Sequence, residues 1–139
     1  MRSCLLIAIL LLTACGELKS PTDPLGGDGP IDPTATFTRV QNEVFTPNCT
    51  TIGCHDAVGQ QADQVLTAGN AYGNIVGVSS TEMPQLKRIA PGDPAASYLY
   101  RKITGAGITG ERMPLQRPPL DEAKIRLVRD WIRRGAPND

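Results

Sequence analysis

The chain has 139 residues, and its 14 basic side chains balance 14 acidic ones, so the formal net charge is zero. Without a basic surplus to neutralise phosphates, no nucleic acid is expected as a partner. Aromatic residues make up only 4% of a chain that is 40% hydrophobic, so the usual large core-filling side chains are scarce. The single histidine, His55, excludes two-histidine copper sites, Cys₂His₂ zinc fingers and HExxH metalloproteases.

Residues 1–14 have the pattern of a secretory signal peptide: Arg2 precedes an apolar run, Cys4 to Leu12, that is too short to span a bilayer. The tetrapeptide Leu-Thr-Ala-Cys that ends at Cys15 resembles the lipobox of bacterial lipoproteins, in which cleavage before the cysteine leaves it N-terminal and lipidated. This resemblance predicts that Cys15 anchors the protein to a membrane of the bacterial cell envelope, on the periplasmic side. Under the sorting rule of these lipoproteins, Gly16 after the cysteine, in place of Asp, favours the outer membrane. The alternative is an ordinary signal peptide followed by an incidental cysteine.

Residues 15–36 are predicted to be the lipidated cysteine and a disordered linker. Between Glu17 and Thr36 the chain contains four Pro and three Gly and shows no apolar periodicity, so it cannot bury enough surface to order itself. The remaining residues, 37–139, then form one small folded domain.

The apolar pattern of this domain predicts helices and no strands, because no segment alternates with a period of two. Near its start, four apolar residues at helical spacing form one stripe: Phe37, Val40, Val44 and Phe45. Pro47 is expected to end this first helix. A short second helix is expected within residues 70–78.

Two later helices have clear start signals. Asp93 and Pro94 are an N-cap and a first helical residue, and they predict a helix that reaches Ile103. Asp121 caps the longest segment, which ends near Gly135 and whose core-facing residues recur at helical spacing: Ile125, Leu127, Val128, Trp131 and Ile132. The predicted class is therefore all-α, with long Gly/Pro loops.

The chemistry of the chain is concentrated between Cys49 and His55. Two cysteines followed at once by a histidine is the order of c-type haem attachment, in which each thiol adds to a vinyl group as a thioether and the histidine binds the iron. The spacing here is Cys-x4-Cys-His in place of Cys-x2-Cys-His, so two extra residues must bulge, which small residues such as Thr50 and Gly53 permit. The motif predicts one covalent haem c on Cys49 and Cys54, with His55 as an iron ligand.

Other interpretations of these three residues remain open. In an oxidising periplasm Cys49 and Cys54 could form a disulfide in a haem-free structural or binding lipoprotein. The two thiols and His55 could instead bind Zn²⁺ or Cu(I), although a fourth ligand would still be needed.

The order of parts from Phe37 to Ala136 resembles the class I cytochrome c family, in particular the small domains found on secreted and lipid-anchored bacterial proteins. The matching parts are a first helix with Phe45, the Cys49–His55 motif, Pro91-Gly92-Asp93-Pro94 before a helix with Ser97-Tyr98-Leu99, Gly110-Glu111-Arg112-Met113-Pro114, and a last helix with Asp130-Trp131-Ile132. The resemblance implies a small fold in which the first and last helices cross beside one haem.

The resemblance also implies the sixth iron ligand. In the family this ligand is a methionine in the loop before the last helix, often followed by proline. Met113, followed by Pro114 in the long loop Gly105–Pro119, occupies that place. Met83 is the rival ligand, but it lies upstream of the helix that Asp93 caps, out of family order.

A haem with His55 and Met113 as axial ligands has no open iron position. This implies a periplasmic one-electron carrier that exchanges electrons with redox partner proteins, in preference to an enzyme. If Met113 does not bind, the open iron suits a haem enzyme or a binder of peroxide or a small gas. Arg88 and Arg112 could pair with haem propionates or be ordinary surface charges.

Overall fold

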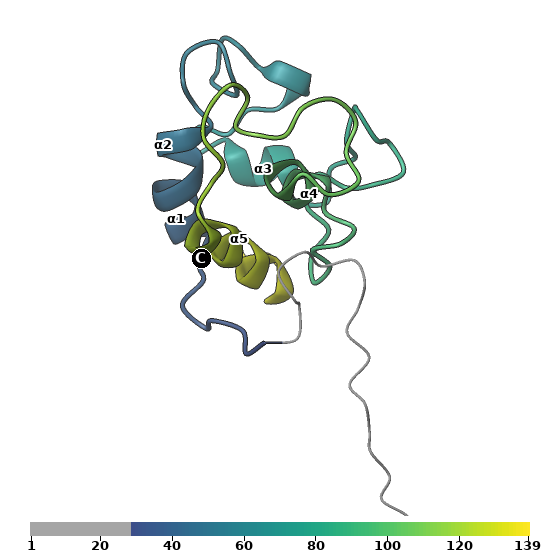
Figure 1. Cartoon of the computed structure of the whole chain (residues 1–139). Helices are drawn as coiled ribbons and strands as arrows, with labels where there is room; N and C mark the ends of the chain where they lie inside the picture. The colour runs from purple at the N-terminus through teal and green to yellow at the C-terminus, as the bar shows by residue number, and fades with distance from the viewer. Residues whose placement is uncertain (1–28) are drawn as a thin grey trace, which may run out of the picture.

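The computed structural model describes residues 29–139, so the predicted leader, Cys15 and the first part of the linker lie outside the described residues (Figure 1). The helical segments in order are α1 (Phe37–Arg39), η1 (Val40–Phe45), α2 (Thr46–Asn48), η2 (Gln61–Asp63), α3 (Ala71–Ile75), α4 (Tyr98–Thr104) and α5 (Glu122–Arg133). Between them the described residues form isolated β-bridges and no strand, which confirms the all-α class. No helix in this part of the chain is long and apolar enough to cross a membrane.

The first helix ends at Asn48, one residue after Pro47, so the sequence predicts its end to within one residue. α1, η1 and α2 follow one another without a break, and η1 is π-helical. Pro47 has no amide hydrogen to donate to the preceding turn. The side-chain amide of Asn48 donates instead to the carbonyls of Glu43 and Val44, at 3.4 and 2.9 Å. The carbonyl of Glu43, which lacks a bond from Pro47, therefore has a side-chain partner in the last turn before the helix ends at Asn48.

The helix predicted to start at Asp93 begins only at Tyr98. Asp93 does cap a turn, because its carboxylate accepts from the amide of Ala96 at 2.9 Å. Ser97 then adopts an extended backbone, with φ −92° and ψ 105°. Its hydroxyl accepts from the amide of Ala90 at 2.9 Å and donates to the carbonyl of Asp93 at 2.7 Å. These bonds hold a separate turn in front of the helix. Ser and Asp side chains bond to the backbone both in such turns and in helix caps, so the sequence pattern does not distinguish the two.

The short helix and the last helix lie where the sequence predicts them. α3 falls within the predicted range 70–78. α5 is capped by Asp121, whose carboxylate accepts from the amide of Lys124 at 2.9 Å. Gly135 follows the end of α5 with a φ of +93°, the left-handed conformation typical of a helix C-terminus.

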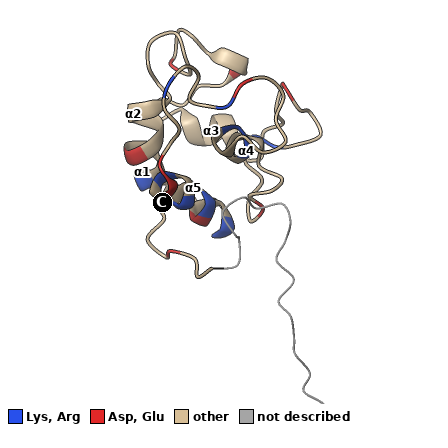
Figure 2. Cartoon of the chain, in the orientation of Figure 1, with Lys and Arg blue, Asp and Glu red and all other residues tan. Residues whose placement is uncertain are grey.

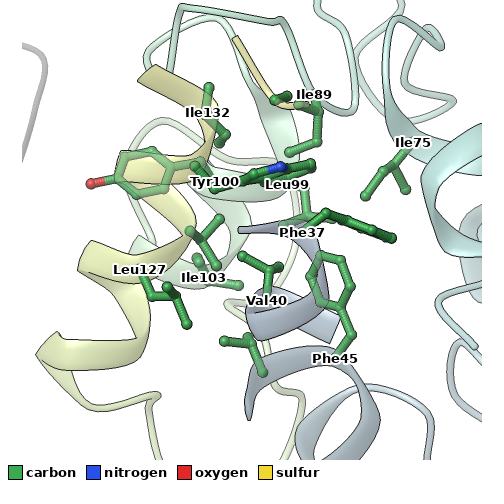
Figure 3. Packing of buried hydrophobic residues seen from close by; sticks show 14 of the residues in the cluster. Phe37, Val40, Phe45, Ile75, Ile89, Leu99, Tyr100, Ile103, Leu127 and Ile132 are labelled. Atoms are coloured by element: carbon green, nitrogen blue, oxygen red, sulfur yellow. The ribbon is translucent and has the colours of Figure 1, made fainter. Parts of the chain in front are cut away.

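The core lies where η1 and α4 pack against α5 (Figure 3). Phe37 is central to its aromatic part, because its ring centroid is 5.2 Å from that of Tyr72, 5.4 Å from that of Trp131 and 6.5 Å from that of Phe45. Aliphatic side chains fill the space around these rings, among them Val40, Val44, Ile75, Ile89, Val128 and Ile132. Four of the few aromatic residues are thus gathered at one place, where Phe37, Phe45 and Trp131 are buried and Tyr72 is half-buried.

Residues 29–36, which the sequence assigns to the linker, pack on α5. The guanidinium of Arg133 donates to the carbonyl of Gly29 at 2.9 Å, and the amide of Asp32 donates to a carboxylate oxygen of Asp130 at 3.2 Å. Ala35 is fully buried. The packed domain therefore begins before Phe37, because this segment finds partners on α5 that its Pro/Gly-rich composition does not reveal.

Candidate functional site

A cavity of about 350 Å³ lies between α2, the loop after it, α4 and the loop before α5. This volume falls within the range of small-molecule and cofactor pockets. Cys49, Cys54, His55 and Met113, which come from two segments far apart in the sequence, all line the cavity. The predicted ligand residues are therefore brought together, whereas Met83 is not among the lining residues.

Much of the cavity lining is apolar. Several of the lining residues are also buried members of the core: Phe45, Leu66, Leu99 and Ile103. The lining also contains uncharged polar residues and four charged ones, namely Glu82, Arg88, Lys102 and Arg117. An apolar cavity with a few charged groups is the environment that an apolar cofactor with polar substituents requires.

The segment Cys49–His55 is closed into a compact loop. The amide of His55 donates to the carbonyl of Cys49 at 3.2 Å, and the amide of Cys54 donates to the carbonyl of Thr51 at 2.9 Å. Gly53 has a φ of +84°, and a Cβ atom on Gly59 would lie 2.4 Å from the carbonyl carbon of Gly53. Glycine is therefore required where the loop turns and where it folds back on itself. This turn accommodates the extra residues of the Cys-x4-Cys spacing.

The two cysteines are free thiols with different surroundings. Cys49 is half-buried against the hydrophobic core, and burial raises the pKa of its thiol to about 12, although the nearby Arg117 acts in the opposite direction. Cys54 is exposed. At neutral pH Cys49 is therefore an uncharged thiol when nothing is bound.

The ring of His55 is oriented by a backbone carbonyl. Its Nδ1 lies 3.3 Å from the carbonyl oxygen of Gln64. A carbonyl oxygen can only accept, so this contact assigns the proton to Nδ1 and leaves a lone pair on Nε2. Burial lowers the pKa of His55, although the hydrogen bond to Gln64 acts in the opposite direction. The imidazole is therefore neutral at pH 7, which is the form that binds a metal.

Met113 is attached to α4 through its backbone. Its amide donates to the carbonyl of Lys102 at 2.8 Å. The side chain of Met113 is half-buried and packs against the hydrophobic core, and the peptide bond to Pro114 is cis. The thioether is thus presented at the cavity by an irregular loop whose position depends on α4.

Of the two arginines considered for anionic groups, Arg88 lines the cavity and Arg112 does not. Arg88 is buried, and its guanidinium donates to the carbonyls of Asn74 and Ala62 at 2.9 and 3.1 Å. Arg112 lies over Gly105, where a Cβ atom would be 3.0 Å from its Cδ atom. The guanidinium of Arg88 is therefore already hydrogen-bonded to backbone carbonyls. Arg112 packs against Gly105 in the loop and does not line the cavity.

Three further charged residues at the cavity, Lys102, Glu82 and Arg117, are not identified by the sequence analysis. Lys102 is 8% exposed, and its ammonium lies 3.1 Å from a carboxylate oxygen of Glu82. A lysine in the last turn of a helix is usually explained by its favourable interaction with the helix dipole. Its position in the sequence therefore does not indicate that Lys102 is buried. The helical spacing is the sequence feature that indicates this burial. Lys102 lies three residues after Leu99 and four after Tyr98, so it shares their buried face.

Within residues 29–139 no group of three or more His, Cys, Asp or Glu side chains is arranged to hold a metal ion. Comparison with known proteins gives no match, whether to a family model, a curated protein or a solved structure. The function of the site is therefore inferred from its residues and their geometry.

Proposed function

We propose that this protein is a one-electron carrier that holds a single haem c covalently through Cys49 and Cys54, with His55 and Met113 as the axial ligands of the iron. The observation that carries this proposal is the convergence of two thiols, an imidazole and a thioether on one cavity. The domain is then a small class I cytochrome c-like fold, and the packing of η1 on α5 supports the expected meeting of its first and last helices.

The residues present fit a haem on three counts. Thioether attachment needs two available thiols, and both cysteines are free. An iron ligand needs an imidazole with an uncommitted lone pair, and the carbonyl of Gln64 favours the tautomer that leaves this lone pair on Nε2. A porphyrin needs apolar walls, and these are supplied by Phe45, Leu99 and Ile103.

A bound haem supplies the one-electron Fe(III)/Fe(II) couple at this site. The chain positions the two ligands: Gln64 orients the ring of His55, and the carbonyl of Lys102 holds the backbone of Met113. Buried apolar side chains exclude water from the core side of the cavity. Cys54 is exposed, so a redox partner protein can approach the cavity at that edge.

Two alternatives have less support. A haem enzyme or a binder of peroxide or a small gas requires open iron, whereas Met113 lines the cavity and is tied to α4. The chain has no second histidine to act as a base beside the iron. A haem-free lipoprotein closed by a disulfide between Cys49 and Cys54 leaves the imidazole of His55 and the thioether of Met113 at the cavity without a role.

In this proposal the domain is held on the periplasmic side of a bacterial envelope membrane by lipid on Cys15, and Gly16 favours the outer membrane. The support comes from the sequence, since residues 1–28 lie outside the described part of the chain. Because residues 29–36 pack on α5, the tether between lipid and domain would be residues 16–28.

The decisive experiment is the mass of the denatured protein. The full chain is expressed in a host whose ligation system attaches haem to Cys-x4-Cys-His motifs, with a known protein of that spacing as the positive control. We expect the mass of the polypeptide plus one haem, and no haem on a Cys49→Ser/Cys54→Ser variant. A haem-free polypeptide two hydrogens lighter than the sequence would establish the disulfide and overturn the proposal.

A further inference from the structure

Four hydrogen bonds join α4 to the loop that contains Met113, one of them from the hydroxyl of Tyr98 to the carbonyl of Thr109 at 3.4 Å. The ammonium of Lys102 donates to the carbonyl of Thr109 at 3.1 Å, and the hydroxyl of Tyr98 accepts from the amide of Thr109 at 3.1 Å. The carbonyl of Lys102 accepts from the amide of Met113 at 2.8 Å. One short helix therefore holds this loop at two points.

The ammonium of Lys102 is itself surrounded by partners. It lies 3.1 Å from a carboxylate oxygen of Glu82 and 5.9 Å from the ring centroid of Tyr98, and the residue is 8% exposed. A buried ammonium is unfavourable unless it is paired, so these contacts are mutually dependent. Lys102, Glu82 and Tyr98 all line the cavity, which places this cluster beside the candidate ligands.

The loop from Gly105 to Pro114 has no regular structure of its own to replace these contacts. Three of its glycines have positive φ angles: Gly105, Gly107 and Gly110. Glycine adopts many backbone conformations when unrestrained, so the loop needs outside contacts to stay in one of them. α4 supplies the contacts described above.

We propose that Lys102 is a positioning residue whose ammonium latches the loop Gly105–Pro114 to α4 and to Glu82, and thereby keeps Met113 at the cavity. Its consequence for iron ligation rests on the proposed function, whereas the latch itself is a property of the chain. Lys102 does not touch the iron in this scheme. It acts by limiting how often Met113 leaves the cavity.

The test compares amide hydrogen exchange in the full-length wild type and two variants. Lys102→Met keeps an unbranched side chain of similar length but removes the ammonium, and Tyr98→Phe removes only the hydroxyl that Thr109 contacts. Lys87→Met is the matched control, because its exposed ammonium donates to Ser79 away from the loop.

We expect the amides of Thr109 and Met113 to exchange about tenfold faster or more in Lys102→Met, since a hydrogen bond from a charged donor contributes at least that factor to an opening equilibrium. Tyr98→Phe should accelerate exchange at Thr109. Lys87→Met should match the wild type. Core amides of α5 report whether each variant is folded, and if Lys102→Met also loses protection there, Tyr98→Phe decides the outcome.

A second readout is the rate at which cyanide binds the oxidised, haem-loaded protein, which should rise in Lys102→Met and stay unchanged in Lys87→Met. Wild-type exchange rates at Thr109 and Met113 in a folded Lys102→Met would overturn the latch, even if haem is bound. Faster loop exchange in a chain that carries no haem would support the latch while refuting the proposed function.

Discussion

Nδ1 of His55 lies 3.3 Å from the carbonyl oxygen of Gln64. The same stretch is tied a second time, because the amide of Leu66 donates to the carbonyl of His55 at 2.8 Å. The imidazole is thus oriented by main-chain atoms, which stay in place when the side chain of His55 is removed.

His55→Gly should therefore accept an external imidazole in place of the missing ring. In the haem-loaded variant, added imidazole is expected to restore the low-spin absorption spectrum, with its second nitrogen donating to the carbonyl of Gln64. 1-Methylimidazole has no N–H to donate and should bind about tenfold or more weakly. 4-Methylimidazole is the control of equal size that keeps the N–H, and it should bind like imidazole. Equal binding of all three would show that the carbonyl does not act on the ligand.

Replacing Met113 should open the iron, whereas replacing Met83 should not. Met113→Ala is expected to lose the far-red sulfur-to-iron charge-transfer band of the oxidised protein, to lower the reduction potential and to bind cyanide or CO readily. Met83→Ala is the matched control, since Met83 is not among the cavity-lining residues. Loss of the band in Met83→Ala with retention in Met113→Ala would reassign the ligand. A wild type without the band would favour the haem enzyme or gas binder.

Cys15→Ser should release a soluble domain that still carries haem, because the proposed lipid site and the haem site are separate parts of the chain. The measurement is detergent phase separation of wild type and variant, combined with their visible spectra. Identical partitioning of the two proteins would refute the anchor.

The buried ion pair on α5 should contribute far more to stability than an exposed pair on the same helix. This helix carries more Lys and Arg than Asp and Glu (Figure 2). The guanidinium of Arg129 lies 2.9 Å from the carboxylate of Asp130, with side chains 5% and 7% exposed. Asp130→Ala leaves Arg129 buried without this partner, and we expect a loss of about 3–5 kcal/mol in the free energy of unfolding. Arg126→Ala breaks only the exposed pair with Glu122 and should cost less than about 1 kcal/mol. Denaturant unfolding of both variants checks the difference, and equal losses would contradict it.

Acid should weaken the attachment of Asp139 to the first helix. The amide of Phe37 donates to its carboxylate at 2.8 Å, and this bond, followed by that from Arg134, holds the pKa of Asp139 below its usual value. A lowered pKa contributes stability that is present above the unfolded-state pKa and is lost as pH falls through the folded-state pKa. Unfolding midpoints measured from pH 6 to pH 2 should therefore fall less for Asp139→Asn than for the wild type. Parallel curves would show that this carboxylate contributes nothing.

The sequence alone identifies features whose partners are close along the chain. Asp121 predicts the start of α5 because a cap bonds to an amide three residues away, and the apolar stripe predicts its buried face. The adjacency of Cys54 and His55 is likewise visible in the sequence itself. These inferences depend on interactions within one or two turns, which composition and spacing encode directly.

The tertiary structure decides what depends on contacts between distant segments. Residues 29–36 pack on the domain because α5 offers Arg133 and Asp130. Met113 lines the cavity and Met83 does not, which spacing alone cannot establish. Likewise the burial of Lys102 depends on Glu82 and Thr109 reaching it from two other segments. Such contacts form only when the folded core brings the segments together, so the local pattern around each residue does not contain them.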